Sequence, residues 1–316
     1  MATEEFLVGY TGFVGSNLAN SHNFSGLFNS KNIADAFGKN PDLLIYAGIP
    51  ARKFYANQNP EEDLKIIENA MENIKKINPK NLVLISTIDV ISNPNNFCET
   101  DKTNKAELQP YGYNRFLLEE WAQSNFENCH IVRLPALFGD NLKKNFIFDI
   151  IHPIPSVIEQ TQFKNLSSKN SDLDKYYQDN HDGFYKLKDT PTKEEQKDIV
   201  KILKSLDFTT LNFTDSRAEY QFYNLHNLWS HIEIILKENL PLLHLATEPV
   251  VASEIYEYVF HSKWENKLEG QPAKYNYKTI YDKLFNGQNG YILTKDKILS
   301  DLDSFIKAGL EQQNEA

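Results

Sequence analysis

Short runs of consecutive apolar residues alternate along the chain with longer stretches in which apolar residues recur every three or four positions. The first pattern is typical of parallel strands buried on both faces, and the second is typical of amphipathic helices. The expected strands cover residues 6–8, 24–33 with its turn, 42–48, 81–90, 127–139 with its exit loop, and 242–249. The expected helices cover residues 60–76, 109–121, 193–206 and 228–238, and another begins at Ser253. Strands that alternate with helices predict an α/β fold built on a parallel sheet.

A glycine turn joins the first strand to the first helix. The apolar residues 6–8 run into Gly9-x-x-Gly12-x-x-Gly15 and then into the apolar start of a helix. Glycines let backbone N–H groups approach an anion closely, and a helix N-terminus carries about half a positive charge. Gly9 would allow the tight turn, Gly12 the close approach of a ligand, and Gly15 the packing of helix on strand. The motif therefore predicts a site for a dinucleotide pyrophosphate, although a glycine turn without a ligand has the same pattern.

Composition and charge narrow the class of protein. The chain has 316 residues, 41% of them hydrophobic and 24% charged, which suits a nucleotide-binding domain plus a smaller lobe. Its formal net charge of −10 opposes binding to nucleic acid or to an anionic membrane surface. Cys98, Cys129 and the eight histidines match no metal-ligand spacing, so no metal site is expected. We find neither a membrane span nor the positive start of a signal peptide, so we expect a cytoplasmic protein.

Three further motifs carry candidate chemistry. The strand at 81–90 contains Ser86-Thr87, a helix begins with Gln109-Pro-Tyr-Gly-Tyr-Asn-Arg115, and Arg133-x-x-x-x-Phe-Gly139 follows the next strand. Tyr111 and Arg115 are four residues apart, so they share one face of the helix. A tyrosine poised near pH 7 needs its pKa lowered by about 3 units, or about 4 kcal/mol. A unit charge at roughly 4 Å in an effective dielectric of about 20 supplies that amount.

Together with the glycine turn, these motifs resemble the short-chain dehydrogenase/reductase superfamily, specifically its extended branch that acts on nucleotide sugars. The resemblance extends over roughly residues 5–150 and, weakly, over 220–260. It implies a Rossmann-like doubly wound parallel sheet with a smaller, partly helical C-terminal substrate lobe. The NAD(P)-binding domain would comprise residues 1–150, with 218–242 returning to it, and the lobe would comprise 151–217 and 243–316.

The resemblance also implies an activity. That activity is reversible hydride transfer between NAD(P) and a sugar carbon of a nucleotide sugar, by an epimerase or a ketosugar reductase. Tyr111 would be the acid/base, Thr87 would orient the reacting oxygen, and Arg115 would lower the pKa of the tyrosine and hold the nicotinamide ribose. Taken alone, Thr87 is also typical of a β-branched residue that ends a strand.

Two departures from the family pattern matter. The family has lysine where this chain has Arg115, so the alternative is a catalytically weak NAD(P)-binding interaction or regulatory protein. Sugar-nucleotide dehydratases have Thr-Asp-Glu where this chain has Thr87-Ile88-Asp89, so dehydration is disfavoured.

The expected cofactor is NADP, with NAD as the alternative. An NAD site usually places an acidic residue at the end of the second strand, where this chain has Asn29, Ser30 and Lys31. A solvated turn would show the same residues. The expected cofactor contacts are Gly9, Thr11, Gly12, Phe13, Val14, Gly15, Asn29, Ser30, Lys31, Ala47, Gly48, Tyr111 and Arg115.

The expected substrate contacts are Thr87, Asn145 and Arg217. Asn145 matches an asparagine that often contacts the sugar-nucleotide diphosphate in the family, but it could equally be a helix N-cap. Arg217 does not fall at the family's arginine position. Family members commonly pair through the helix that carries the tyrosine and the preceding crossover helix, which implies a homodimer with Phe116 and Trp121 as candidate contacts. Burial in the core would explain these two aromatic residues equally well. Loops are expected at 167–171 and 189–192, and a frayed tail at 307–316.

Overall fold

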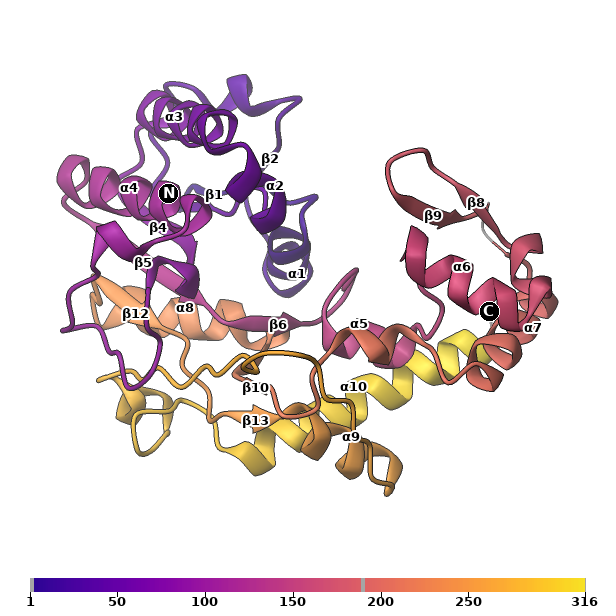
Figure 1. Ribbon diagram of the computed structural model, residues 1–316. Helices are drawn as coiled ribbons and strands as arrows, with labels where there is room; N and C mark the ends of the chain where they lie inside the picture. Colours follow the sequence, from indigo (N-terminus) through magenta and orange to yellow (C-terminus); the bar gives the residue numbers. More distant parts are fainter. Residues whose placement is uncertain (1–2, 189–190, 316) are drawn as a thin grey trace. The chain divides into compact units, whose positions relative to one another are not determined.

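The computed structural model describes residues 3–188 and 191–315, and the chain divides into two compact units. The first comprises Met1–Leu142, Glu219–Val250 and Lys274–Asp301, and the second comprises Lys143–Ala218, Val251–Ala273 and Leu302–Ala316. The units are interleaved in sequence, because the chain leaves the first after Leu142 and returns to it twice (Figure 1). Asp189 and Thr190, part of a predicted loop, lie outside the described residues.

A parallel sheet of six strands forms the centre of the first unit, in the spatial order β2-β1-β3-β4-β5-β12. The strands are β1 (Glu5–Val8), β2 (Gly26–Phe28), β3 (Leu43–Tyr46), β4 (Asn81–Thr87), β5 (Cys129–Leu134) and β12 (Leu242–His244). The strand order reverses between β2 and β3, on either side of β1. The predicted Rossmann-like α/β fold is therefore confirmed.

The strands bury both faces, which explains their unbroken apolar runs. In β1, Leu7 belongs to the core on one side, whereas Phe6 and Val8 belong to the core on the other side. The parallel register pairs Phe6 with Leu44 and Leu7 with Ile45. Paired residues of β1 and β3 therefore point to the same face of the sheet, and the next pair points to the opposite face. Such strands require helices on both sides of the sheet.

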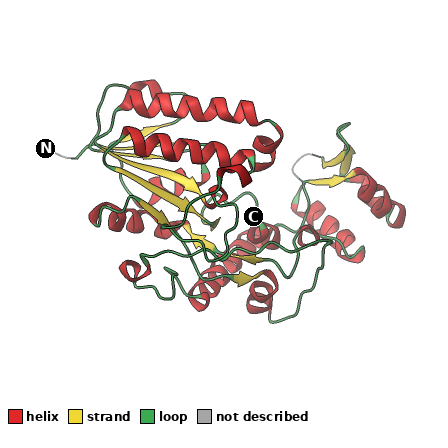
Figure 2. Cartoon of the chain, turned by 60° about the vertical axis from the view of Figure 1, so that its left-hand side comes forward, coloured by secondary structure: helices red, strands yellow, loops and turns green. Residues whose placement is uncertain are grey.

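Helices cover the two faces of the sheet (Figure 2). Apolar residues of α1 (Phe13–Ser21) and α8 (Leu228–Lys237) pack in one core, and those of α3 (Pro60–Ile77) and α4 (Pro110–Asn125) pack in the other. The helix α3 begins with a proline, carries three acidic residues in its first turn and two lysines in its last turn. These charges complement the helix dipole and fix the ends of a helix that spans the sheet.

Shorter elements complete the first unit. They are α2 (Lys53–Gln58), the parallel pair β6 (Ala136–Phe138) and β11 (Phe222–Asn224), and β10 (Glu219–Tyr220), which pairs with β13 (Val250–Val251). The predicted strand at 24–33 is shorter than expected, because only Gly26–Phe28 pairs with β1.

The second unit holds a small antiparallel sheet in the order β7-β9-β8, formed by Val157–Glu159, Phe184–Leu187 and Tyr177–Asp179. Its helices are α5 (Phe146–Ile151), α6 (Gln160–Lys169), α7 (Lys193–Ser205) and α9 (Ala252–Phe260), and α10 (Lys295–Glu315) contributes to both units. The predicted helix at 193–206 is confirmed by α7. The loop expected at 167–171 is wrong at its start, since α6 extends to Lys169.

The predicted frayed tail is also wrong. The helix α10 continues to Glu315, and it buries Ile298, Leu302 and Ile306. These residues recur at helical spacing, and their burial stabilises the whole helix, including its polar last turns.

Candidate cofactor and catalytic site

The glycine turn follows β1 directly and begins α1. Gly9 has a φ of 94°, and a Cβ there would lie 2.5 Å from the Ala47 carbonyl oxygen. A Cβ on Gly15 would lie 2.1 Å from the Gly9 carbonyl oxygen, so the helix packs on the turn with no room for a side chain. At Gly12, by contrast, a Cβ would meet only the Gly9 oxygen, at 3.3 Å, among the described residues. The fold itself requires glycine at 9 and 15, while Gly12 leaves open space beside the N-terminus of α1.

This open space fits a dinucleotide pyrophosphate. It lies beside β1, where the strand order reverses, and ligands of open α/β sheets bind at such points. Thr11 and Gly12 are exposed, and Gly12 is the N-cap of α1 without a side chain of its own to satisfy the first N–H groups. An anion could therefore accept these N–H groups and interact with the helix dipole.

The turn after β2 is shaped by asparagines. The backbone N–H of Lys31 donates to Asn29 Oδ1 at 2.9 Å, and the N–H of Asn29 donates to Asn32 Oδ1 at 2.8 Å. Ser30 and Lys31 are exposed on this turn. Asn29 thus supports the backbone of the turn, and the contact of Ser30 and Lys31 with a phosphate stays a prediction.

A cavity of about 190 Å³ lies at the carboxyl ends of β4 and β5 in the first unit. Thr87 lines it, together with Asp89 and Lys53. The Thr87 hydroxyl accepts the N–H of Asp89 at 3.2 Å, and Asp89 Oδ1 pairs with Lys53 Nζ at 2.6 Å. Burial lowers the pKa of Lys53, but the Asp89 carboxylate outweighs burial and leaves that pKa raised. The cavity therefore combines a hydroxyl, a carboxylate and a permanent cation.

The same cavity contains an unsatisfied hydroxyl. Tyr277 lines it and is fully buried, yet its hydroxyl has no hydrogen-bond partner within the described part of the chain. Its backbone is held by Gln221, which accepts the Tyr277 N–H and donates to the Tyr277 carbonyl, both at 2.9 Å. Burying a hydroxyl without a partner costs free energy, so this group has an unmet capacity for hydrogen bonding.

Tyr111 lies in the first turn of α4, beside this cavity's edge. A Cβ on Gly112 would lie 2.0 Å from the Asp89 carbonyl oxygen, so the start of α4 packs directly on the backbone at Asp89. Tyr111 is 6% exposed and does not itself line the cavity. Burial raises the pKa of Tyr111, although the Arg115 guanidinium, 3.7 Å from the ring centroid, acts in the opposite direction. The net lowering expected from the sequence is therefore not observed.

Burial is the largest cause of this rise, and the nearby Asp89 carboxylate adds to it. Arg115 itself is held by a buried carboxylate. Its two Nη atoms donate to the Asp63 carboxylate at 2.5 and 3.0 Å, and also to the carbonyls of Tyr111 and Pro50 at 3.1 and 2.9 Å. Arg115 and Asp63 are 4% and 3% exposed. This bidentate pair ties α4 to α3 and neutralises the cation. The predicted ribose contact of Arg115 stays a prediction, and it would require these bonds to be exchanged.

A second buried ion pair anchors the other end of α4. Glu119 accepts from Arg133 on β5, with its shortest contact at 2.6 Å, and from the Ser86 hydroxyl at 2.5 Å. Arg133 also contacts His244 Nε2 on β12 at 3.1 Å. Burial, followed by the Arg133 charge, lowers the pKa of His244 to about 3, so His244 stays neutral. Arg133, the first residue of the motif that ends at Gly139, thus has structural partners here.

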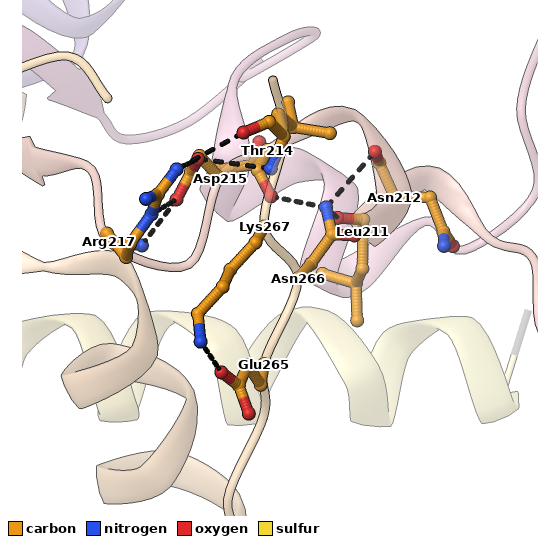
Figure 3. A network of polar contacts seen from close by, with 9 residues as sticks. Leu211, Asn212, Thr214, Asp215, Arg217, Glu265, Asn266 and Lys267 are labelled. Carbon is orange, nitrogen blue, oxygen red and sulfur yellow. Dashed lines mark hydrogen bonds and ion pairs between the residues drawn. The ribbon is translucent and has the colours of Figure 1, made fainter. Parts of the chain in front are cut away.

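Two predicted substrate residues, Asn145 and Arg217, belong to the second unit. Asn145 Oδ1 accepts the N–H groups of Ile147 and Phe148, so it caps α5. Arg217 pairs with Asp215 at 2.6 Å, in a network that joins residues 211–217 to 265–268 (Figure 3). Their binding of substrate stays a prediction.

No protein-family model and no curated protein matches the chain in sequence. Solved structures match it over nearly its whole length. One is dTDP-4-dehydrorhamnose reductase from Bacillus anthracis str. Ames in complex with NADP, which is 13% identical with a TM-score of 0.62 and coverage of 98% of this chain and 99% of that one. Another is UDP-N-acetylglucosamine 4-epimerase from Methanobrevibacter ruminantium M1 in complex with UDP-N-acetylmuramic acid. It is 14% identical with a TM-score of 0.62, and the match covers 98% of this chain and 99% of that one. A third is RMD from Pseudomonas aeruginosa complexed with NADPH. It is 12% identical with a TM-score of 0.62, and the match covers 99% of this chain and 100% of that one.

The chain shares the fold of these proteins. The predicted resemblance is confirmed at that level, since the neighbours are named as nucleotide-sugar reductases and epimerases. Within the described residues, no helix is long and apolar enough to cross a membrane, and no cluster of His, Cys, Asp and Glu could hold a metal ion.

Sequence reasoning missed Lys53 and Tyr277 and gave Asp89 no positive role. Lys53 and Asp89 follow β3 and β4 closely, and ligands of parallel sheets bind at the carboxyl ends of the strands. Their position in the sequence could therefore have identified them as candidate site residues. Tyr277 lies in a segment without helix or strand, and nothing local distinguishes it from the chain's other tyrosines.

We expect Asp63→Asn to destabilise the protein by about 3–5 kcal/mol, because it leaves Arg115 buried without its counter-charge. The double variant Asp63→Leu/Arg115→Met should recover most of that loss. Urea denaturation at neutral pH measures both. Glu72→Gln is the control, since it breaks an exposed pair with Lys76 on the same helix and should cost less than about 1 kcal/mol. Equal losses for Asp63→Asn and Glu72→Gln would contradict a stabilising role of the buried pair.

Proposed function

We propose that the chain is an NADP-dependent oxidoreductase of nucleotide sugars, either a ketosugar reductase or an epimerase, and that NAD is the weaker cofactor. The observation that carries the proposal is the pairing of two features in one unit. Gly12 leaves a gap at the N-terminus of α1, and the cavity with Thr87 and Tyr277 lies at the carboxyl ends of β4 and β5. Solved structures with this fold include a reductase in complex with NADP and an epimerase in complex with a UDP-sugar.

The nicotinamide would supply the hydride, and the residues of this chain would bind and protonate the sugar oxygen. Thr87 and the unsatisfied Tyr277 hydroxyl would hydrogen-bond that oxygen. Lys53 pairs with Asp89, and its ammonium has further N–H groups that would donate a hydrogen bond to that oxygen. Tyr111 would donate the proton. The raised pKa of Tyr111 keeps the phenol protonated, which favours proton donation during ketone reduction over the proton abstraction that an alcohol oxidation needs.

Two observations favour the alternative of a catalytically weak NAD(P)-binding protein. Arg115 is neutralised by Asp63, and Tyr111 lies outside the cavity lining. In that case the glycine turn would still bind the dinucleotide, and the protein would act through an interaction or regulation. Turnover, and not cofactor binding, separates the two proposals.

The proposal extends to the second unit, the localisation and the partners of the protein. The second unit would serve as the substrate lobe. Because the reaction would use NADP and nucleotide sugars, we place the protein in the cytoplasm. We propose no nucleic-acid or membrane partner, in view of the net charge of −10.

We expect NADPH to bind with higher affinity than NADH, and Gly12→Val to abolish binding of both by filling the space beside α1. Lys31→Gln should weaken NADPH binding by about fivefold, or about 1 kcal/mol, and leave NADH unchanged, because only NADPH carries the 2′-phosphate. Calorimetric titration of the two cofactors measures this, with circular dichroism as the check on folding. Unchanged NADPH affinity in folded Gly12→Val would end the assignment of this turn.

We expect Tyr111→Phe to reduce turnover by about 10²–10⁴-fold while leaving NADPH affinity close to unchanged, because the hydroxyl acts mainly in the transition state. The assay offers dTDP-4-dehydrorhamnose with NADPH, and UDP-galactose or UDP-N-acetylglucosamine with NADP. Tyr113→Phe, which changes an exposed tyrosine on the same helix, is the control. Full activity of Tyr111→Phe would refute the role of Tyr111, and a large loss in Tyr277→Phe instead would transfer the role to that residue.

We also propose a homodimer through α3 and α4, in which the half-buried Phe116 and Trp121 of α4 contribute to the interface. Light scattering should give twice the 36.5 kDa mass of the chain. Trp121→Glu should shift the protein to the monomer, because a buried unpaired carboxylate is costly at an interface. A monomer mass for the unsubstituted protein at working concentration would refute the proposal.

A further inference from the structure

The second unit contains a cavity of about 960 Å³, and none of its lining residues lines the cavity of the proposed reaction. Residues of α5, α7 and the end of α10 line it, and Figure 1 shows these helices. Its apolar lining includes Phe148, Ile151, Val157, Val200, Phe213 and Leu310. Val157 and Phe213 are 45% and 47% exposed, so large apolar side chains here face solvent and not the core. A cavity of this size and lining is suited to a small molecule with an apolar body.

Lysines surround the apolar lining. Lys143, Lys144, Lys193, Lys197, Lys201 and Lys204 all line the cavity, and Asp149 is the single carboxylate among the described lining residues. In the part of the chain that the structure describes, Lys143, Lys197, Lys201 and Lys204 form no ion pair. Such a concentration of positive charge is unexpected in a chain with a net charge of −10. The cavity is therefore electrostatically complementary to an anion.

The helix α7 carries four of these lysines, Lys193, Lys197, Lys201 and Lys204. Ile199 and Leu203 on one face of α7 are fully buried in the core of the second unit. A capping box between Thr192 and Glu195 holds the start of the helix. Lys193, Lys197 and Lys201 recur every four residues, so they form a stripe on another face, with Val200 beside it. The charge and the apolar contact thus come from one rigid element.

We propose that this cavity binds the phosphate monoester of an apolar chain. The apolar lining requires an apolar body, and several lysines favour a head group with more than one negative charge. A phosphate monoester carries about −1.5 to −2 at neutral pH, whereas a carboxylate carries a single charge. A bare phosphate would leave the apolar lining exposed, and an acidic peptide helix would need a longer groove than a cavity of small-molecule size.

Calorimetric titration of the full chain with octyl phosphate, kept below the concentration at which it forms micelles, tests the proposal. We expect one molecule to bind per chain. Inorganic phosphate and octanol should bind at least about tenfold more weakly, and octanoate should fall between them and octyl phosphate. Lys197→Gln/Lys201→Gln should weaken octyl phosphate binding by about 25-fold, at about fivefold for each lysine. Val200→Asp should weaken it as well.

Lys164→Gln/Lys169→Gln is the matched control. Both lysines are exposed on α6 and do not line the cavity, and this double variant removes as much charge as Lys197→Gln/Lys201→Gln. Circular dichroism and thermal unfolding check that each variant folds. Inorganic phosphate or octanoate binding as tightly as octyl phosphate would overturn the proposal. So would the absence of binding, an equal effect of the two double-lysine variants, or binding to anionic vesicles without binding of monomeric octyl phosphate.

Discussion

The buried pair of Arg115 with Asp63 is the interaction on which the geometry of the site depends. Arg115 and Asp63 are both less than 5% exposed, and they pair in bidentate geometry, with further bonds from Arg115 to backbone carbonyls. The pair fixes α4 against α3. The start of α4 packs directly on the backbone at Asp89, which is possible because Gly112 has no side chain. Tyr111, the preceding residue, is thereby held beside the cavity.

The Arg115–Asp63 pair serves the structure of the site, whereas the chemistry depends on the pKa of the neighbouring Tyr111. The charge of Arg115, which pairs with the buried Asp63 carboxylate, lowers the pKa of Tyr111, whereas burial and the Asp89 carboxylate raise it. Burial accordingly outweighs Arg115, and the pKa of Tyr111 is raised. The cation that lines the cavity is Lys53, held by Asp89 at 2.6 Å. We therefore propose that Arg115 is a structural cation and that Tyr111 acts as a protonated donor.

Local patterns in the sequence predicted the sheet, its helices and the glycine turn, because buried parallel strands and close backbone packing leave signatures within a few residues. The partner of Arg115 could not be predicted in this way, since Asp63 is 52 residues distant and lies among other acidic residues at the start of α3. The unsatisfied hydroxyl of Tyr277 depends on folding of the whole first unit. The helical tail was missed for another reason: its last turns are polar and are stabilised by apolar residues one to four turns earlier in α10.

The most direct test is to measure the pKa of Tyr111 in the protein without cofactor. Tyrosine labelled with ¹³C at Cζ gives one NMR signal for each side chain, and Tyr111→Phe identifies the signal of interest. Titration from about pH 6 to about pH 11 then follows its ionisation. The account predicts that Tyr111 is still protonated at about pH 10, the ordinary pKa of tyrosine. A pKa near 7 would contradict it, because Arg115 would then be activating the phenol in spite of its pairing with Asp63.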